Sequence, residues 1–445
     1  MFSKVLIPNR GEIALRIMRA CRDLNIACVV AHSEADRASL PVRLAENSIC
    51  IGPSPAGKSY LSVPNIISAA LVTGCDAIHP GYGFLAEDHY FAEICGEYDL
   101  TFIGPSAQAI RRVGNKAAAR RTMAEAGLPI LPGSDGPVSS LEDAQSAARD
   151  IGYPIILKAS AGGGGRGMHV ATDERDLTQG YNLARVEARA SFDNDEVYVE
   201  RFLGKARHVE VQVLGDLRGN IVHLGERECS IQRRHQKIIE EAPSMSIGPE
   251  TRLRLGQAAV QGAGALDFTS AGTLEFLVDD DGRFYFMEMN TRIQVEHGIT
   301  EIVTGVDIVR DQLLIAMGEA LAFRQEDVRL NGHAIECRVN AETGAEFRPS
   351  TGTVTELLLP GGPGIRVDTH MYTGYALPAH YDSLLAKIMA FGVDRAEAIA
   401  RMRRALAETV IEGVPNTLEV LRSVLYDPAF IAGHVYTDYF ATRMP

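Results

Sequence analysis

The first 110 or so residues alternate short apolar runs with segments whose apolar residues recur at helical spacing. Ile13, Ile17 and Cys21 mark one such helix, between the first two runs. Strands that alternate with helices predict a parallel α/β sheet, whose ligands bind in the loops that follow the strands. Four apolar runs predict those strands: KVLI (4–7), IACVVAH (26–32), CDAIHP (75–80) and LTFIG (100–104).

After a cluster of prolines and glycines at 129–137, the pattern predicts a compact unit and then antiparallel sheet. The unit comprises a helix near 140–151, strand YPIILKA, a glycine-rich loop, strand MHVA, a helix near 174–190 and strand VYVERF. From about 208, HVEVQVLG with IVHLGE and GTLEFLV with RFYFMEMN predict two hairpins. From about 331, the predicted elements are strands HAIECRVNAE, TGTVTELLL and SLLAKIMAF and helices near 394–408 and 416–426.

Composition places the chain among ordinary globular proteins. It has 445 residues, 46% hydrophobic and 23% charged, which suggests about three domains. The net charge of −13 argues against a general nucleic-acid or anionic-membrane surface. The seven cysteines never form a C-x-x-C pair, and the N-terminus has no long apolar stretch, so we expect a cytoplasmic protein without disulfides, a zinc framework or a membrane span.

The stretch GPSPAGKS (52–59) fits the G-x-x-x-x-G-K-[ST] pattern of a phosphate-binding loop. Pro53 and Pro55 remove two of the backbone N–H donors that such a loop needs. Pro64 falls where its helix should already be running, and Ser62 with Pro64 fits the cap and first turn of a later helix. We therefore interpret 52–59 as a strand-to-helix turn without a nucleotide.

The second glycine-rich stretch, KASAGGGGRGM (158–168), lies between two predicted strands. Its glycines leave the backbone free to wrap phosphate oxygens, and Lys158 and Arg166 supply positive charge. A surface loop without function is the alternative, so the stretch gains weight only together with other segments.

Three polar residues interrupt the apolar strands of the second hairpin. Glu275 lies in the middle of GTLEFLV, and Glu288 and Asn290 share one face at the end of RFYFMEMN. A tight turn would bring Glu275 beside Glu288, and such an oxygen-rich group suits Mg²⁺. We expect Lys116 and Lys158 to add charge at the phosphates of a nucleotide.

The continuation NTRIQVEHG keeps a period of two, which predicts an extended segment with Asn290, Arg292, Gln294 and Glu296 on one face. A solvated amphipathic strand is the alternative. With a metal site beside it, Arg292 is a candidate anion clamp and Glu296 a candidate general base. Upstream, ERECSIQRRHQK gathers five basic groups including Lys237, while His208 could equally be a packed core histidine.

Six motifs together resemble the biotin carboxylase family of the ATP-grasp superfamily, over essentially the whole chain and in the family's order. They are NRGEIALRI, HPGYGFL, KASAGGGGRGM, ERECSIQRRHQK, EMNTRIQVEH and HAIECRVNAE. The resemblance implies a multidomain α/β and α+β protein. Its parts would be a Rossmann-like N-terminal domain (1–114), an ATP-grasp domain (115–330) with a mobile lid (about 131–203), and a C-terminal biotin carboxylase domain (331–445).

The resemblance also implies the reaction and the residues that perform it. ATP would phosphorylate bicarbonate to carboxyphosphate, and the carbon dioxide released would carboxylate N1 of biotin on a separate carrier. The ligands implied are ATP, two Mg²⁺ (or Mn²⁺) ions, bicarbonate and carrier-bound biotin. The implied ATP contacts are Lys116, Lys158, Gly163, Gly164, Gly165, Met168, Glu200, Arg201, Leu203, His208, Gln232 and His235. The implied metal ligands are Glu275, Glu288 and Asn290, and the implied bicarbonate contacts are Lys237, Arg292, Gln294 and Val295. In the same resemblance Glu296 is the base, and Arg338 and Tyr82 contact biotin.

Some positions depart from the family pattern. Arg201 stands where lysine is usual, and Arg348 where an apolar residue is usual. Gly298 replaces a usual proline and is expected to loosen the loop behind Glu296, while Asn416 and Thr417 reverse a usual order. None of these changes removes a catalytic group.

Partners follow from what the chain lacks. A biotin-accepting lysine in a Met-Lys-Met context is absent from the sequence, so the biotin carboxyl carrier protein and the carboxyltransferase subunits are expected to be separate. The resemblance to bacterial subunits of the family implies that the chain is a homodimer. Acetyl-CoA carboxylase is the first expectation for the whole enzyme; another acyl-CoA, pyruvate or urea-type carboxylase is the alternative. A non-catalytic ATP-binding regulator and an ATP-grasp ligase that makes amide bonds are the other candidates, and neither requires the full set of site residues.

Overall fold

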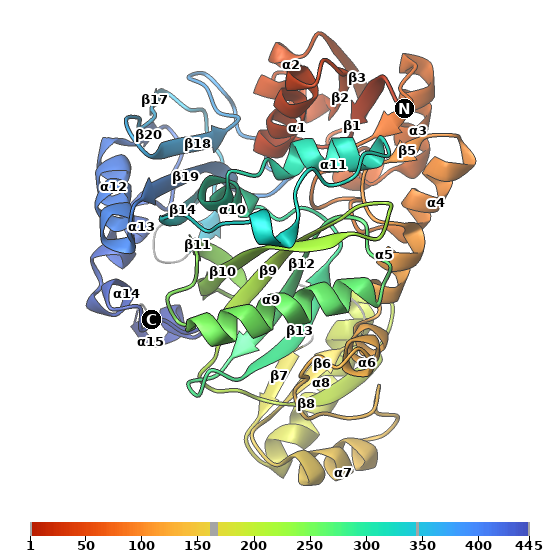
Figure 1. Ribbon diagram of the computed structural model, residues 1–445, viewed down its shortest axis with the longest axis vertical. Coiled ribbons are helices and arrows are strands. Elements are labelled where there is room, and N and C mark those ends of the chain that lie inside the picture. The colour runs from red at the N-terminus through yellow and green to blue at the C-terminus, as the bar shows by residue number, and fades with distance from the viewer. Residues whose placement is uncertain (1, 161–167, 344–346, 444–445) are drawn as a thin grey trace.

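The computed structural model describes residues 2–160, 168–343 and 347–443. Three sheets dominate these residues (Figure 1). A parallel sheet near the N-terminus lies at one end of the long axis and a small antiparallel sheet at the other, with a large antiparallel sheet between them. Within the described residues, no helix is long and apolar enough to cross a bilayer.

The N-terminal part is the parallel α/β unit that the sequence predicts. Its strands are β1 (Lys4–Ile7), β2 (Ala27–Ser33), β3 (Asn47–Gly52), β4 (Ala77–Ile78) and β5 (Thr101–Phe102), in the order β3-β2-β1-β4-β5. Within β1, Val5 and Ile7 pack in one core cluster and Leu6 in another, so both faces of the sheet are buried. The helices are α1 (Gly11–Asp23), α2 (Leu40–Leu44), α3 (Val63–Thr73), α4 (His89–Glu97) and α5 (Ala107–Gly114).

The segment 52–59 is a turn, as predicted. It holds one short 3-10 turn, Ala56–Lys58, and the next helix, α3, begins only at Val63 with a proline in its first turn. Lys58 is exposed. Ser62 precedes the helix, but its side chain makes no capping hydrogen bond. No helix N-terminus therefore faces a phosphate here.

A three-stranded antiparallel sheet in the order β7-β6-β8 forms the second unit. The strands are β6 (Ile155–Ala159), β7 (Met168–Ala171) and β8 (Val197–Arg201), covered by α7 (Leu141–Ile151) and α8 (Glu174–Phe192). It has its own apolar core and follows α6 (Lys116–Glu125). The predicted contacts Gly163, Gly164 and Gly165 lie outside the described residues.

The central sheet has eight antiparallel strands in the order β13-β12-β9-β10-β11-β14-β19-β18. It crosses the expected boundary at residue 330, because β11 pairs with β14 from the C-terminal part. The strands are β9 (Arg207–Gly215), β10 (Ile221–Arg233), β11 (Gln236–Ala242), β12 (Ser270–Val278), β13 (Phe284–Asn290), β14 (His333–Asn340), β18 (Ile365–Thr369) and β19 (Leu384–Gly392). Residues from the second and third regions of the sequence thus lie on one sheet.

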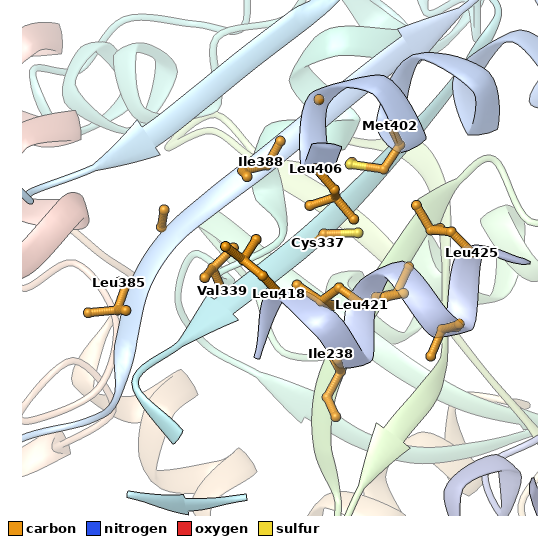
Figure 2. Close-up of a cluster of buried hydrophobic side chains, with 14 of the residues drawn as sticks. Ile238, Cys337, Val339, Leu385, Ile388, Met402, Leu406, Leu418, Leu421 and Leu425 are labelled. Carbon is orange, nitrogen blue, oxygen red and sulfur yellow. The ribbon is translucent and has the colours of Figure 1, made fainter. Parts of the chain in front are cut away.

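A large apolar cluster anchors the C-terminal half of this sheet (Figure 2). Leu406 on α12 (Arg395–Glu408) and Leu421 on α13 (Leu418–Tyr426) point toward Cys337 and Val339 on β14. Side chains alternate along a strand, so Arg338 faces the opposite side of the sheet from Cys337 and Val339.

The remaining elements complete the periphery. The predicted strand TGTVTELLL is shorter than expected, since only β17 (Glu356–Leu358) forms, paired with β20. The others are α9 (Pro249–Gly264), α10 (His297–Thr304), α11 (Ile308–Ala316), β15 (Glu342–Thr343), β16 (Arg348–Pro349), β20 (Val410–Glu412), α14 (Pro428–Ile431), α15 (Tyr439–Arg443) and the 3-10 turns η1 (Glu34–Asp36), η2 (Ala56–Lys58) and η3 (Gln325–Asp327).

The prediction that NTRIQVEHG forms an extended segment is wrong. Strand β13 ends at Asn290, the next six residues are irregular, and α10 begins directly after Glu296. The loop needs an apolar residue at position 293, because Ile293 is fully buried between polar neighbours. Its sequence therefore alternates apolar and polar residues as a strand does. The loop nevertheless brings the side chains of Arg292, Gln294 and Glu296 into one network, described below.

Truncation of the C-terminal cluster should destabilise the protein. Leu421 is fully buried, and Leu421→Ala should lower the unfolding free energy by about 2–5 kcal/mol, because it leaves a cavity among helices and sheet. Leu358 is 53% exposed, so Leu358→Ala is the matched control and should change it by less than about 0.5 kcal/mol. Thermal melting of both variants checks this; equal melting temperatures would contradict the packing.

Candidate functional site

A cleft of about 1190 Å³ opens between the N-terminal unit, the small sheet and the central sheet. Seventeen of the residues predicted for the site line it: Tyr82, Lys116, Lys158, Met168, Arg201, Leu203, His208, Gln232, His235, Lys237, Glu275, Glu288, Asn290, Arg292, Gln294, Val295 and Arg338. Glu200 and Glu296 are buried beside it, in contact with cations that line the cleft. The structure thus collects predicted residues from segments between residues 82 and 338 into one place.

Three glutamates form a row across neighbouring strands: Glu275 and Glu288 line the cleft, and Glu210 is buried behind it. Glu275 on β12 is the register partner of Glu288 on β13, as the sequence predicts, and of Glu210 on β9. Directly opposed residues on one face have their Cβ atoms about 4.5–5.5 Å apart. Sequence reasoning missed Glu210, although polar residues at 208, 210 and 212 of the apolar strand HVEVQV were a usable signal.

The ammonium of Lys237 joins three buried carboxylates. Its Nζ lies 3.1 Å from Glu275 Oε1 and 2.7 Å from Glu296 Oε1, and it also pairs with Glu210. Burial disfavours the charged amine, but the three carboxylates outweigh burial and hold the pKa of Lys237 well above its usual value. Lys237 is therefore a fixed cation whose removal would leave several buried anions without a partner.

A second buried cation fixes the outer end of this row. The guanidinium of Arg227 is fully buried and donates to Glu210 Oε1 at 2.6 Å, to Gln212 at 2.9 Å and to Thr300 at 2.9 Å. With Arg227 and Lys237 both engaged, Glu210 serves as a structural counter-ion behind the cleft. Nothing in the motif ERECSIQRRHQK singles out Arg227 from its basic neighbours.

Glu275 is the most heavily bonded carboxylate of the cleft. Its Oε1 accepts from Asn290 Nδ2 at 2.9 Å and Gln294 Nε2 at 3.0 Å, and its Oε2 lies 2.9 Å from His208 Nε2. Burial opposes its ionisation, but Lys237 and His208 hold its pKa far below the usual range. His208 is therefore an ion-pair partner in the cleft, although it is also buried as the alternative reading expected.

The oxygen donors of this region suit a hard divalent cation. Glu275 and Glu288 present carboxylates on adjacent strands, and Asn290 adds an amide oxygen, which is the donor set that Mg²⁺ prefers. Glu288 is held 2.7 Å from the ammonium of Lys116, a charge that a cation could replace. His208, Glu210 and Glu275 also have ligand atoms within 4.8 Å of one another, but two buried cations already occupy Glu210.

The guanidinium of Arg292, the candidate anion clamp, is held by three hydrogen-bond partners in the cleft. Its guanidinium donates to Glu87 Oε2 at 2.9 Å, to Gln294 Oε1 at 2.9 Å and to Asn290 Oδ1 at 3.1 Å. Burial disfavours its charge, but Glu87 leads the carboxylates that raise its pKa. The sequence analysis did not predict Glu87, which follows the motif HPGYGFL; only Tyr82 in that motif was predicted for the site.

Glu296 is buried between two cations. Its Oε1 accepts from Lys237 at 2.7 Å and its Oε2 from Arg338 at 2.9 Å. Burial alone would raise its pKa, but Lys237 and Arg338 hold it well below the usual value, so the carboxylate is ionised near neutral pH. A carboxylate held between cations can accept a proton once an incoming anion competes for those cations.

A buried bridge fixes the loop that carries Glu296. Lys387 on β19 donates to the carbonyl of Val295 at 2.7 Å and pairs with Glu12 on α1 at 3.0 Å. Glu12 in turn accepts from the hydroxyl of Tyr82 at 2.6 Å. Neither Lys387 nor Glu12 was predicted, because an isolated lysine in the apolar strand SLLAKIMAF and a glutamate in NRGEI carry no local signature.

At the far end of the cleft, the small sheet supplies further cations. Lys158 on β6 pairs with Glu200 on β8, which also accepts from Arg120 at 3.1 Å. Arg201 extends from β8 into solvent and donates to the carbonyl of Ile151 at 3.1 Å. The guanidinium at this position is thus held by the backbone of the small sheet's own helix.

The other departures from the family pattern have local explanations. Gly298 is buried in α10, and a Cβ there would lie 2.4 Å from Met389 Sδ, so the space of a side chain at this position is filled by Met389. Thr417 Oγ1 accepts from the backbone N–H of Asn340, at the end of the strand that carries Arg338. Arg348 is exposed on β16.

Replacement of Lys237 should have a pH-dependent effect on stability. Lys237→Met leaves Glu210, Glu275 and Glu296 without their shared cation, which should lower the unfolding free energy by about 3–5 kcal/mol near neutral pH. In the parent protein Lys237 holds the pKa of Glu275 and Glu296 low, so their stabilisation persists above the unfolded pKa. In the variant those pKa values rise, and protonation relieves the buried charge as the pH falls.

The difference in melting temperature between the two proteins should therefore shrink from about pH 7.5 to about pH 5. Differential scanning fluorimetry at matched ionic strength measures it. A difference that stays constant or widens on acidification would contradict the cluster.

The chain is similar to known proteins in sequence and in structure. Sequence models of three families match: Biotin carboxylase, N-terminal domain over residues 1–110; Carbamoyl-phosphate synthase L chain, ATP binding domain over 115–324; and Biotin carboxylase C-terminal domain over 336–442. A biotin carboxylase of Nostoc sp. is 52% identical over 98% of each chain.

Two solved structures are similar over the whole chain. The biotin carboxylase–beta-gamma-ATP complex from Campylobacter jejuni has a TM-score of 0.98 at 45% identity and covers 100% of this chain and 99% of its own. The biotin carboxylase domain dimer of the Hydrogenobacter thermophilus 2-oxoglutarate carboxylase, in complex with MgADP, ADP and bicarbonate, has a TM-score of 0.96 at 45% identity and covers 100% and 98%. The full-length matches, in sequence and in structure, assign the chain to the biotin carboxylase family.

Proposed function

We propose that the protein carboxylates biotin on a separate carrier, using ATP and bicarbonate through a carboxyphosphate intermediate. The observation that carries this proposal is the buried Glu296, held between Lys237 and Arg338 and connected through Lys237 to Glu275. One hydrogen-bonded network thus links a base, an anion-binding cation and a candidate metal ligand. The similarity to the two enzyme complexes supports the same conclusion.

The nucleotide would bind between the small sheet and the central sheet. Lys116 and Lys158 would bind its phosphates, with Gly163, Gly164, Gly165 and Met168 over them. Glu275, Glu288 and Asn290 would hold Mg²⁺ (or Mn²⁺), which when bound neutralises charge on the transferring phosphoryl group. The adenine contacts in this proposal are Glu200, Arg201 and Leu203, and His208, Gln232 and His235 complete the nucleotide site.

Bicarbonate would bind at the centre of the network. Arg292 is held rigid by Glu87 and Gln294, which pre-organises it for a small anion. Lys237 and Gln294, with the backbone of Val295, complete this site. Because the anion competes for Lys237, it weakens the hold of that cation on Glu296 and raises the basicity of the carboxylate toward what proton removal needs. The deprotonated bicarbonate oxygen then attacks the γ-phosphorus and ADP leaves.

Biotin would meet the same network from the side of the N-terminal unit. Arg338 would stabilise the negative charge that develops on the ureido oxygen, because a fixed guanidinium serves best where charge appears during the reaction. Tyr82 lies beside the biotin ring in this proposal, oriented by its hydrogen bond to Glu12.

The partners are part of the proposal. We infer a biotin carboxyl carrier protein, separate carboxyltransferase subunits and a homodimeric, cytoplasmic enzyme. Acetyl-CoA carboxylase is the first assignment for the whole complex. An enzyme with another acceptor is the second, because a similar structure belongs to a 2-oxoglutarate carboxylase.

The first test is phosphate release from Mg-ATP by the purified chain. We expect hydrolysis that depends on bicarbonate and that free biotin stimulates, since both steps occur in one cleft. A coupled phosphate assay with bicarbonate-free buffer as the control measures this. A folded protein that binds ATP but releases no phosphate under any of these conditions would contradict the proposal.

Two substitutions test whether the activity depends on the cleft or on the turn at 52–59 that matches the phosphate-loop pattern. Glu296→Gln removes the base and should lower the bicarbonate-dependent rate by about 10²–10⁴-fold, because proton removal contributes that much. Lys58→Ala, in the exposed turn that matches the P-loop pattern, should keep the rate within about twofold. Steady-state kinetics of both variants decide; a large loss for Lys58→Ala would restore the P-loop interpretation.

A further inference from the structure

Two glutamates that the proposed mechanism does not use lie beneath Arg338. Glu240 on β11 and Glu336 on β14 are register partners, and both are fully buried. On β14, Glu336 and Arg338 share one face, while Cys337 and Val339 between and beyond them face the apolar cluster of Figure 2. The two carboxyl groups therefore lie side by side on the same face of the sheet as Arg338.

One nitrogen of Arg338 serves two carboxylates. Its Nη2 donates to Glu296 Oε2 at 2.9 Å and also forms an ion pair with Glu240 Oε1. The guanidinium is thus held from two sides, by a residue in the candidate bicarbonate site and by one behind it.

Glu336 differs from Glu240 although both are equally buried. Glu240 Oε1 forms an ion pair with Arg338, whereas no cation among the described residues pairs with Glu336, whose two carboxyl oxygens also lack a hydrogen-bond partner there. Two neighbouring buried carboxyls cannot both ionise at low cost, and the one next to a guanidinium ionises first. Glu240 is accordingly the anion of the pair and Glu336 the neutral acid.

We propose that Glu240 is a positioning residue for Arg338: it keeps the guanidinium in place for biotin when Glu296 takes up a proton. This inference rests on the proposed function. When Glu296 accepts the proton of bicarbonate, its carboxylate becomes a neutral acid and the attraction between Glu296 and Arg338 weakens. In molecules in which Glu240 is ionised, its ion pair with Arg338 persists through that step. Arg338 then faces biotin with its position unchanged, at the moment when negative charge develops on the ureido oxygen.

The surroundings of Glu240 support this assignment. The titratable and charged groups that face it are Arg338 and Glu336 from β14, Glu296 from the segment before α10, Lys237 from its own strand and the Cys229 thiol from β10. Burial raises the pKa of Glu240 to about 7, even though Arg338 counteracts it. Burial is also the largest of the causes that raise the pKa of Glu336 well above its usual value.

The test compares two isosteric substitutions in the full-length protein, Glu240→Gln and Glu336→Gln. Two rates are measured with Mg-ATP and bicarbonate: phosphate release without biotin, and carboxylation of free biotin. The parent protein is measured first, because a parent that shows neither activity refutes the proposed function and not this inference.

Glu240→Gln should lower kcat/KM for biotin by about tenfold or more and leave the biotin-independent rate and the KM for ATP within about twofold. Glu336→Gln replaces a neutral acid with a neutral amide and should leave both rates within about twofold. The biotin-dependent rate of the parent should also rise with pH through neutrality as Glu240 ionises, and Glu240→Gln should remove that rise.

Three outcomes would overturn the inference: Glu240→Gln with parental biotin kinetics, an equal loss of both rates, or a Glu336→Gln variant that loses as much as Glu240→Gln. If Glu240→Gln does not fold, Glu240→Asp keeps the anion but draws it back from Arg338. A loss confined to biotin carboxylation then supports the inference, and no loss or an equal loss of both rates refutes it.

Discussion

The structure depends on the ion pairs that neutralise a buried ammonium, Lys237, and three buried carboxylates. Charges removed from water are tolerated only when opposite charges and hydrogen bonds surround them. Here the sheet provides that arrangement, because the register of β9 and β12 places Glu210 opposite Glu275, and the loop before α10 brings Glu296 to the same ammonium. The same interactions that permit burial hold the side chains in fixed positions, which is what electrostatic catalysis requires.

The continuous central sheet explains how distant segments contribute to one site. Strand β14 comes from the C-terminal part of the chain, yet its pairing with β11 aligns Arg338 with the carboxylates of the middle part. The apolar cluster of α12 and α13 buries the opposite face of β14 and so fixes the rotation of that strand. Packing on one face of the sheet thereby positions chemistry on the other.

Much of the fold and most of the site could be predicted from the sequence. The four predicted N-terminal strands, the small sheet and the pairing of Glu275 with Glu288 follow from local periodicity and short turns, and the structure has them, whereas strand β3 was not predicted. The family resemblance named residues that the structure brings together in the cleft. What could not be predicted depends on contacts between segments far apart: Glu12 with Lys387, Arg227 with Glu210, and the single sheet across residue 330.

The one wrong element has a physical cause. NTRIQVEHG alternates apolar and polar residues as a strand does, but its Ile293 is buried in a cluster that the N-terminal unit, the central sheet and α11 share, and the segment itself pairs with no strand. The crowding at Gly298 could not be predicted either, because a sequence does not show that Met389 occupies the space of a side chain there. The alternation of apolar and polar residues, together with the residue types, indicates which side chains are buried. It does not indicate which distant segment buries them.

The central claim is that this cleft activates bicarbonate by phosphorylating one of its oxygens. Bicarbonate labelled with oxygen-18 tests it most directly, by mass spectrometry of the phosphate released while biotin is carboxylated. The account predicts that one labelled oxygen passes from each bicarbonate to phosphate, because the attacking oxygen stays on phosphorus when carboxyphosphate breaks down. Unlabelled phosphate in the presence of carboxylated biotin would contradict it, since water and not bicarbonate would then have attacked ATP.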